Sequence, residues 1–382
     1  MTTSSGGARQ GVSARAWADV DLGAIEHNVR GIRSLVGPAQ VCAVVKADGY
    51  GHGAVHVARA ALSAGASRLA VATPREAEAL RRAGLTAPIQ VLGVVLAGQE
   101  SFFLTLDAAA TVSTLEEAQR LAAAARSAGR KTAVHLKLDT GMHRLGATRD
   151  EAEKIAGLLA SSPEVAFEGA MTHLAAAGSR ADYTASQLDA FRDFIGWMRA
   201  RRVCPPLLHA ANSAALALHP DSRFDMVRPG LAIYGVADPP ELAARLDLRP
   251  AMRLCARVVN VKRLSPGEPV GYECAWQARR ETTVATASIG YADGLRTTLS
   301  NRGQALLRGQ RVPVIGRVSM DFTALDVTGL DAVQPGEEVV FFGRQGAAEI
   351  PVTEAAAWMG AIPYEIICGV SFRVWRVPKS NG

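Results

Sequence analysis

The sequence predicts an α/β fold followed by an all-β region: an N-terminal (β/α)8 barrel of the TIM type and a C-terminal β domain. Two patterns of apolar segments along the sequence support this prediction. Between residues 41 and 230, eight short apolar runs alternate with longer amphipathic or Ala-rich segments. Beyond residue 245, strand-like runs follow one another, separated by Gly- and Pro-containing turns. Alternating strands and helices over about 200 residues are typical of a (β/α)8 barrel.

The eight apolar runs are continuous rather than alternating, which favours strands buried on both faces, as in a parallel sheet. They span residues 41–46, 68–73, 89–94, 108–113, 133–139, 167–173, 207–213 and 224–230. A doubly wound open sheet is the main alternative. The dinucleotide-binding motif that often accompanies such an open sheet is missing, because no GxGxxG stands between the first apolar run and the segment after it.

The segments between the runs carry helix boundaries. PREAEALRRAG has Pro74 at a helix start and Gly84 beyond its end. TLEEAQRLAAAARSAG has Thr114 as N-cap, Glu117 at the third helical position and Gly129 closing it.

The expected domain division is a tail at 1–12, the barrel at 13–245 and the β domain at 246–382. Turns such as SPGEP and QPGEE separate the strands of the last region. No repeat of fixed period and no low-complexity tract interrupts either half.

Composition narrows the class of protein. The chain has 382 residues, 48% of them hydrophobic and 20% charged, and a net charge of +6. Basic residues are interspersed with acidic ones, so no patch predicts nucleic-acid binding. The 5 cysteines form no CxxC pair, which argues for a reducing compartment and against a metal site. Without a secretory h-region or a long apolar run, we expect a soluble, cytoplasmic protein with no membrane contact.

In a barrel the active site lies at the carboxyl ends of the strands. Reading the last residues of each run gives a set of polar side chains that should converge there. They are Lys46, Lys137, Arg144, His173, His209, Ser213 and Arg228.

Lys46 is the informative member of this set, because lysine is rare in the chain and this one ends an apolar run. Desolvation lowers the pKa of such a lysine and makes its amine available for a Schiff base. A lysine extending past its strand to solvent is the alternative. Tyr50, Ser213 and the backbone at Gly230 are neutral donors suited to a phosphate. A phosphate beside a Schiff-base lysine is what pyridoxal phosphate requires.

Seven blocks together resemble the alanine racemase family. In order they are VVKADGYGHG, HLKLDTGMHRLG, MTHLAAA, HAANSAA, VRPGLAIYG, SIGYADG and GRVSMD, within residues 15–375. The resemblance implies a pyridoxal-phosphate enzyme of fold type III: an N-terminal barrel, a C-terminal β domain and a homodimer with shared active sites. It implies racemisation of alanine, with D-alanine destined for peptidoglycan.

The resemblance also implies roles for single residues. Lys46 would hold the cofactor and act as one base, and Tyr291 of the β domain would be the other base, in the partner's site. The cofactor phosphate would be bound by Tyr50, Ser213, Gly230 and Leu231. Arg228 would face the pyridine nitrogen, with His209 behind it and His173 linking it to the partner's Tyr291. Arg144 would contact cofactor and substrate carboxylate, Lys137 would orient Arg144 and is often carbamylated in the family, and the Met320 backbone would help hold the carboxylate.

These implied roles are chemically coherent. Racemisation removes the α-proton from one face and returns it on the other, so it needs two bases. A permanently charged arginine at the pyridine nitrogen disfavours protonation of that nitrogen. That property limits side reactions and argues against a decarboxylase of similar fold.

Two positions depart from the family pattern. Ser319 stands where a cysteine often precedes the Met-Asp pair, and Phe372 stands where a tyrosine is common. Phenylalanine keeps the ring but removes the hydroxyl donor. Substrate breadth therefore stays open, and a racemase of serine, lysine or a broad set is the main alternative. A non-catalytic pyridoxal-phosphate-binding protein is the other.

Overall fold

The structure is a computed structural model that describes residues 14–379. The described residues divide into two compact units: residues 23–249, and residues 14–22 together with 250–379. The tail expected at residues 1–12 lies outside the described part of the chain.

Residues 23–249 form the predicted barrel. Its strands run parallel in the order β8-β7-β6-β5-β4-β3-β2-β9. They are β2 (Gln40–Val44), β3 (Arg68–Val71), β4 (Ile89–Val91), β5 (Ala108–Val112), β6 (Thr132–Lys137), β7 (Val165–Met171), β8 (Leu207–His209) and β9 (Met226–Val227). Two hydrogen bonds between the segments of β8 and β9, Asp225 N to Leu208 O (3.0 Å) and Arg228 N to Ala211 O (2.9 Å), link the ends of the sheet. The prediction of a TIM-type barrel is confirmed.

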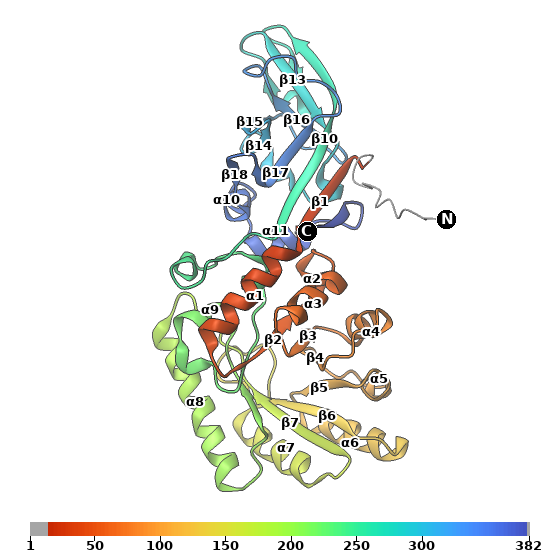
Figure 1. The fold of residues 1–382 in the computed structure, drawn as a ribbon, viewed down its shortest axis with the longest axis vertical. Coiled ribbons are helices and arrows are strands. Elements are labelled where there is room, and N and C mark those ends of the chain that lie inside the picture. Colours follow the sequence, from red (N-terminus) through yellow and green to blue (C-terminus); the bar gives the residue numbers. More distant parts are fainter. Residues whose placement is uncertain (1–13, 380–382) are drawn as a thin grey trace, which may run out of the picture. The chain divides into compact units, whose positions relative to one another are not determined.

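Helices follow the strands, and Figure 1 shows α4 to α7 outside β3 to β7. The helices are α1 (Leu22–Val36), α2 (Lys46–Tyr50), α3 (Ala54–Ser63), α4 (Pro74–Arg82), α5 (Glu100–Leu106), α6 (Leu115–Ala128), α7 (Arg149–Ser161), α8 (Ala181–Ala200) and α9 (Ser213–Leu218), with 3₁₀ turns η2 (Pro220–Ser222), η3 (Leu231–Tyr234) and η4 (Pro240–Ala244). Thr73 and Thr114 each form a complete capping box, with Glu76 and Glu117. Local sequence therefore sets where α4 and α6 begin.

The second unit is built on a nine-stranded sheet of order β18-β17-β14-β15-β16-β13-β10-β1-β19. Because β17 also pairs with β10, six of its strands close into a ring. The strands are β1 (Ala16–Asp21), β10 (Met252–Leu264), β13 (Thr282–Ala287), β14 (Gln304–Leu307), β15 (Gln310–Ile315), β16 (Thr323–Asp326), β17 (Glu338–Gln345), β18 (Ala348–Ile350) and β19 (Trp375–Lys379), with a separate hairpin of β11 (Pro269–Val270) and β12 (Trp276–Gln277). The expected C-terminal β domain is confirmed.

Short helical segments complete this unit. They are α10 (Val352–Trp358), α11 (Pro363–Gly369) and the 3₁₀ turns η5 (Tyr272–Cys274), η6 (Tyr291–Asp293) and η7 (Thr297–Leu299). Among the described residues, no helix is both long and apolar enough to cross a membrane.

The N-terminal strand belongs to a different unit from the one expected, because the expected division placed residues from 13 onward in the barrel. β1 pairs with β10 and β19 and so belongs to the β unit. Trp17 and Ala18 of β1 are buried in the core of that unit with Cys255 and Ala256. A strand that pairs with partners more than 200 residues away leaves no local signal of its location.

Candidate active site

Lys46 lies just beyond the end of β2, at the start of a turn with the opposite hand to a normal helix. Ala47, Asp48, Gly49 and Tyr50 all have positive φ, between 51° and 62°. A left-handed turn costs roughly 1–2 kcal/mol for each residue other than glycine. Such strain persists only where the surroundings fix it, and it occurs preferentially at functional sites.

Several contacts hold this turn. Glu76 of α4 accepts a hydrogen bond from Ala47 N at 2.7 Å, and Asp48 accepts one from Ala54 N at 2.9 Å. The ring of Tyr50 packs on Tyr234 with 4.8 Å between ring centroids. The chain therefore presents Lys46 from a fixed backbone.

A small cradle of donors lies beside Tyr50. Ser213 Oγ accepts hydrogen bonds from the backbone N–H groups of Gly230 (3.0 Å) and Ala232 (3.1 Å). Because both bonds use its lone pairs, the Ser213 hydroxyl hydrogen can point to another acceptor. A Cβ on Gly230 would lie 2.5 Å from Tyr50 Oη, so glycine alone lets the chain approach the tyrosine. Leu231 follows, fully buried at the start of η3.

Arg228 is buried at the end of β9, with 4% exposure. Its Nη1 donates to His209 Nδ1 at 2.6 Å, and its Nη2 donates to the backbone oxygens of Thr172 (2.8 Å) and Ala210 (3.0 Å). Nη2 also lies 3.4 Å from His173 Nδ1. Burial lowers the pKa of Arg228 to about 10, so the group keeps its charge at neutral pH.

Lys137 ends β6 and is buried, whereas Arg144 lies on the loop that follows. Burial, with the charges of Arg228 and Arg144 nearby, lowers the pKa of Lys137 to about 8. Asp139 shapes the loop, because its Oδ1 accepts hydrogen bonds from the backbone of Gly141, Met142 and His143.

The polar residues predicted at the strand ends of the barrel influence one another's pKa values. Burial first, and then the positive charges of Arg228, Lys137, Arg144 and Lys46, lower the pKa of His173 to about 3. His173 is therefore neutral at physiological pH, in a region of concentrated positive charge. Such a region suits an anionic ligand such as a phosphate or a carboxylate.

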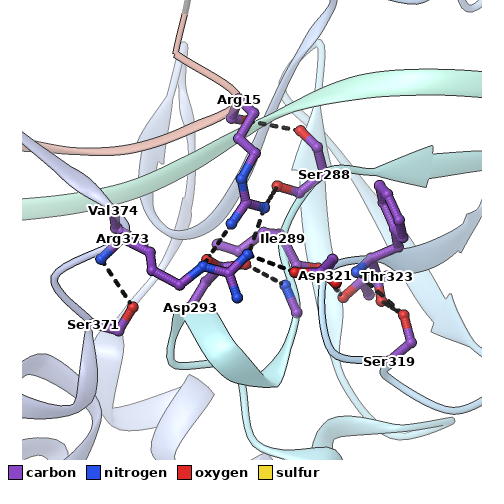
Figure 2. Close-up of polar contacts among 12 residues, drawn as sticks. Arg15, Ser288, Ile289, Asp293, Ser319, Asp321, Thr323, Ser371, Arg373 and Val374 are labelled. Atoms are coloured by element: carbon purple, nitrogen blue, oxygen red, sulfur yellow. Dashed lines mark hydrogen bonds and ion pairs between the residues drawn. The ribbon is translucent and has the colours of Figure 1, made fainter.

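Tyr291 and Met320 lie on neighbouring loops of the β unit. Tyr291 N donates to Ser319 O at 2.9 Å, and Ala292 N donates to Met320 O at 3.1 Å. Both side chains are about half exposed, at 45% for Tyr291 and 51% for Met320. Figure 2 shows the polar contacts beneath these loops, centred on the carboxylate of Asp293.

Sequence reasoning passed over Tyr272, which is 70% exposed on the β unit. It begins η5 (Tyr272–Cys274) directly after Gly271 (φ 75°), and the other two residues of η5, Glu273 (59°) and Cys274 (49°), have positive φ. Backbone strain of this kind persists only where the surroundings fix it, so the turn is a candidate part of a functional surface. The signal in the sequence was the pair Gly-Tyr in VGYECAW, which stands outside the seven blocks.

The fold and these groups define a class: a barrel enzyme with positive charge concentrated at the carboxyl ends of its strands. Family models described as alanine racemase, N-terminal domain, and alanine racemase, C-terminal domain, match residues 20–238 and 251–378. The chain belongs to the alanine racemase family.

Individual relatives agree over nearly the whole chain. An alanine racemase of Desulforamulus reducens is 43% identical and covers 94% of this chain and 98% of its own. The crystal structure of alanine racemase from Streptomyces lavendulae, a D-cycloserine producer, has a TM-score of 0.91 at 36% identity and covers 96% of this chain and 97% of its own. An alanine racemase structure from Bartonella henselae, described with covalently bound pyridoxal phosphate, has a TM-score of 0.85 at 30% identity, covering 96% and 100%.

Proposed function

We propose that this protein interconverts L-alanine and D-alanine with pyridoxal phosphate as cofactor. The observation that carries the proposal is the place of Lys46, on a strained left-handed turn whose last residue, Tyr50, borders the Ser213–Gly230 cradle. Family membership supports the same reaction. The D-alanine formed would serve peptidoglycan synthesis.

The residues present fit this cofactor. The Ser213 hydroxyl and the Tyr50 hydroxyl would hold the phosphate, with the backbone at Gly230 and Leu231, and the Lys46 amine would hold the aldehyde carbon. The close approach of Gly230 to Tyr50 leaves no room there for a side chain, as a cradle for a small anion requires. Pyridoxal phosphate, when bound, withdraws electrons and so acidifies the α-carbon of an amino acid.

The chain's own residues supply the rest of the reaction. Lys46 would remove or return the α-proton on one face. Arg228, buried and charged, would face the ring nitrogen and disfavour its protonation. Arg144 would bind the substrate carboxylate together with the backbone N–H of Met320. Lys137 would orient Arg144, and neutral His173 would connect Arg228 to the second base.

The second base would be Tyr291 of the β unit. Its backbone N–H donates to Ser319 O at 2.9 Å, which fixes the turn that carries it. A side chain that reaches into a partner's site must be exposed, and Tyr291 meets this requirement at 45% exposure.

This arrangement requires a homodimer in which each β unit completes the partner's site. Exposed aromatic rings on the unit support such a surface: Tyr272, Phe322, Phe372 and Trp375 are 70%, 48%, 95% and 60% exposed. All 5 cysteines are free thiols, which fits work in the reducing cytoplasm.

The test is proton exchange in D₂O with purified holoenzyme and L-alanine, followed by NMR together with formation of the D enantiomer. L-serine and L-lysine run in parallel. Exchange with inversion fastest for alanine supports the proposal, whereas faster serine or lysine would move the substrate and implicate Phe372. Cofactor binding without exchange for any substrate would contradict it.

The same assay tests the second base. Tyr291→Phe should lower kcat by about a hundredfold or more, since general-base catalysis contributes typically 10²–10⁴-fold. Tyr272→Phe, the same change at another exposed tyrosine of the β unit, is the matched control and should lower kcat far less. An unchanged kcat in Tyr291→Phe would contradict the assignment.

A further inference from the structure

A row of hydrogen-bonded polar side chains crosses the barrel interior and ends at Arg228. Arg68 donates to Glu168 Oε1 from Nη1 (3.0 Å) and Nη2 (2.5 Å). Glu168 Oε2 contacts His135 Nε2 at 3.0 Å, and His135 Nδ1 contacts His209 Nε2 at 2.8 Å. His209 Nδ1 then contacts Arg228 at 2.6 Å. Four strands, β3, β7, β6 and β8, and the end of β9 each contribute one member.

The row is almost closed to solvent. His135 and His209 have no exposed surface, Arg228 is 4% exposed and Arg68 is 7% exposed. Only the Glu168 side chain, at 26%, reaches partly toward solvent. Interactions between charges are strong in such surroundings and weakly screened.

The chemistry of the end groups fixes every hydrogen in the row. A guanidinium can only donate, so His209 Nδ1 must be the acceptor of the Arg228 hydrogen. His209 then carries its hydrogen on Nε2 and donates to His135 Nδ1. His135 in turn donates from Nε2 to the Glu168 carboxylate. Both rings are neutral, in agreement with burial, which lowers the pKa of each.

The strand geometry is adapted to this row. In the pairing of β6 with β7, Val134 faces Phe167 but His135 faces Gly169, so Glu168 is the extra residue of a β-bulge. Bulges redirect side chains and occur often beside active sites. A Cβ on Gly169 would lie 2.2 Å from His135 Nδ1, so glycine is required for the ring to take its place.

The charges of the row do not cancel within its buried part. Arg68 and Glu168 form an ion pair, and Arg228 adds one positive charge without a carboxylate of its own among the contacts described above. Burial alone would raise the pKa of Glu168, but the hydrogen bond from His135, together with the charge and hydrogen bonds of Arg68, outweighs it and keeps the pKa below its ordinary value. Cys42 on β2 lies near Arg68 and Arg228, and burial raises its pKa to about 12, so it stays a neutral thiol.

We propose that Glu168, itself held by Arg68, is a positioning residue for the racemase site: through His135 and His209 it orients the Arg228 guanidinium and offsets its charge. The inference rests on the proposed function. Each neutral histidine passes the polarisation of the carboxylate to the next hydrogen bond. Loss of the carboxylate charge would leave Arg228 with a stronger positive field at the site and a less fixed orientation.

The test uses paired charge changes in the holoenzyme. Glu168→Gln keeps an acceptor for His135 but removes the negative charge, and Arg68→Met keeps an apolar stem but removes the positive charge. In the pH profile of kcat/KM for alanine, the midpoint of the acidic limb reports the pKa of the catalytic base. Glu168→Gln should lower this midpoint by roughly half a pH unit, because added net positive charge lowers the pKa of the base. Arg68→Met should shift it upward. The Arg68→Met/Glu168→Met double variant should lie near the wild-type midpoint.

A second readout does not depend on activity. The ring ¹⁵N signals of His135 and His209 should show unprotonated Nδ1 and protonated Nε2 in the wild type, unchanged between pH 6 and pH 9. Glu164→Gln is the matched control, because Glu164 just before β7 pairs with the exposed Arg126 outside the row; it should change neither readout.

Shifts of the same sign in the two single variants, or no shift in either, would overturn the proposal, as would a histidine carrying its hydrogen on Nδ1. If Glu168→Gln does not fold, the upward shift of Arg68→Met and the ¹⁵N signals of the wild type still decide. Failure of the proposed function would appear earlier, as a wild-type protein without racemase activity.

Discussion

Arg15 donates two hydrogen bonds to the carboxylate of Asp293, from Nη2 at 2.5 Å and from Nη1 at 3.1 Å (Figure 2). The two residues are 278 positions apart. Asp293 is fully buried, and it also accepts from Gly290 N at 3.0 Å and faces Arg373 Nε at 3.5 Å. One carboxylate therefore ties the segment before β1 and the segment before β19 to the turn that carries Tyr291.

Replacing this carboxylate should destabilise the β unit. Asp293→Asn leaves two guanidiniums without their shared negative partner, and breaking a buried pair in this way costs about 3–5 kcal/mol. We expect about 2–4 kcal/mol, since both arginines are about one-third exposed. Urea unfolding of the purified protein measures it.

The control for that variant is Asp221→Asn, because Asp221 pairs with Arg192 at 3.4 Å on the surface. Exposed pairs contribute about 0–1 kcal/mol. Equal unfolding free energies for the two variants would show that the Asp293 cluster does not hold the unit together.

Gly230→Ala should weaken cofactor binding without unfolding the protein. A Cβ added at Gly230 would lie 2.5 Å from Tyr50 Oη, so alanine there would push the tyrosine hydroxyl aside. Displacing the tyrosine should raise the Kd for pyridoxal phosphate by about tenfold, the equivalent of one lost hydrogen bond. Fluorescence titration of the apoprotein measures the change. Gly157→Ala, on α7 with nothing within 4 Å of its added Cβ, should leave the Kd unchanged.

Lys137 should bind carbon dioxide. Its pKa is lowered to about 8, so near that pH about half of the amine is neutral and nucleophilic. A carbamate would place a negative charge among Arg144, Arg228 and Lys46, where positive charge is in excess. After incubation with ¹³C-bicarbonate at pH 8, we expect one carbamate signal that Lys137→Met lacks. Lys379→Met, a change at the half-exposed partner of Asp19, should retain it; a signal that survives in Lys137→Met would contradict the assignment.

The sequence predicts the barrel and most of the polar residues at the carboxyl ends of its strands. Both the alternation of strands with helices and the position of each strand end are local properties of the sequence. Lys46, Lys137, His173 and Arg228 each stand at or just beyond the end of a short apolar run, where chain position already implies location. The blocks of the family resemblance add Tyr291 and Met320 in the β unit.

What the sequence does not predict depends on partners distant in the chain. Glu168 enters the barrel through a bulge that exists only in the pairing of β6 with β7. β1 joins the β unit because β10 and β19 lie on either side of it. The left-handed turn after Lys46 needs Glu76 as a partner.

The barrel should lose stability as pH falls, because it buries neutral histidines. Burial lowers the pKa of His135, of His209 well below its ordinary value, and of His173 to about 3. The unfolded chain binds these protons at about pH 6.5 and the folded chain only at lower pH, near pH 3 for His173, so the stability they provide is lost as the pH falls below about 6.5.

His173→Asn removes one of these groups and isolates its effect. In wild type, His173 should contribute up to about 2 kcal/mol of lost stability by pH 5, from 1.36 kcal/mol per pH unit below 6.5. The unfolding free energy is measured in urea at several pH values between 7.5 and 5. It should fall less steeply with decreasing pH in His173→Asn than in wild type, and the slopes should differ by the equivalent of about one bound proton. His56→Asn, the same change at an exposed histidine of α3, is the matched control. Identical slopes in His173→Asn and wild type would mean that the folded chain binds the His173 proton at the same pH as the unfolded chain. Burial among positive charges would then not keep His173 neutral, and its proposed place as a neutral link between Arg228 and the second base would have to be given up.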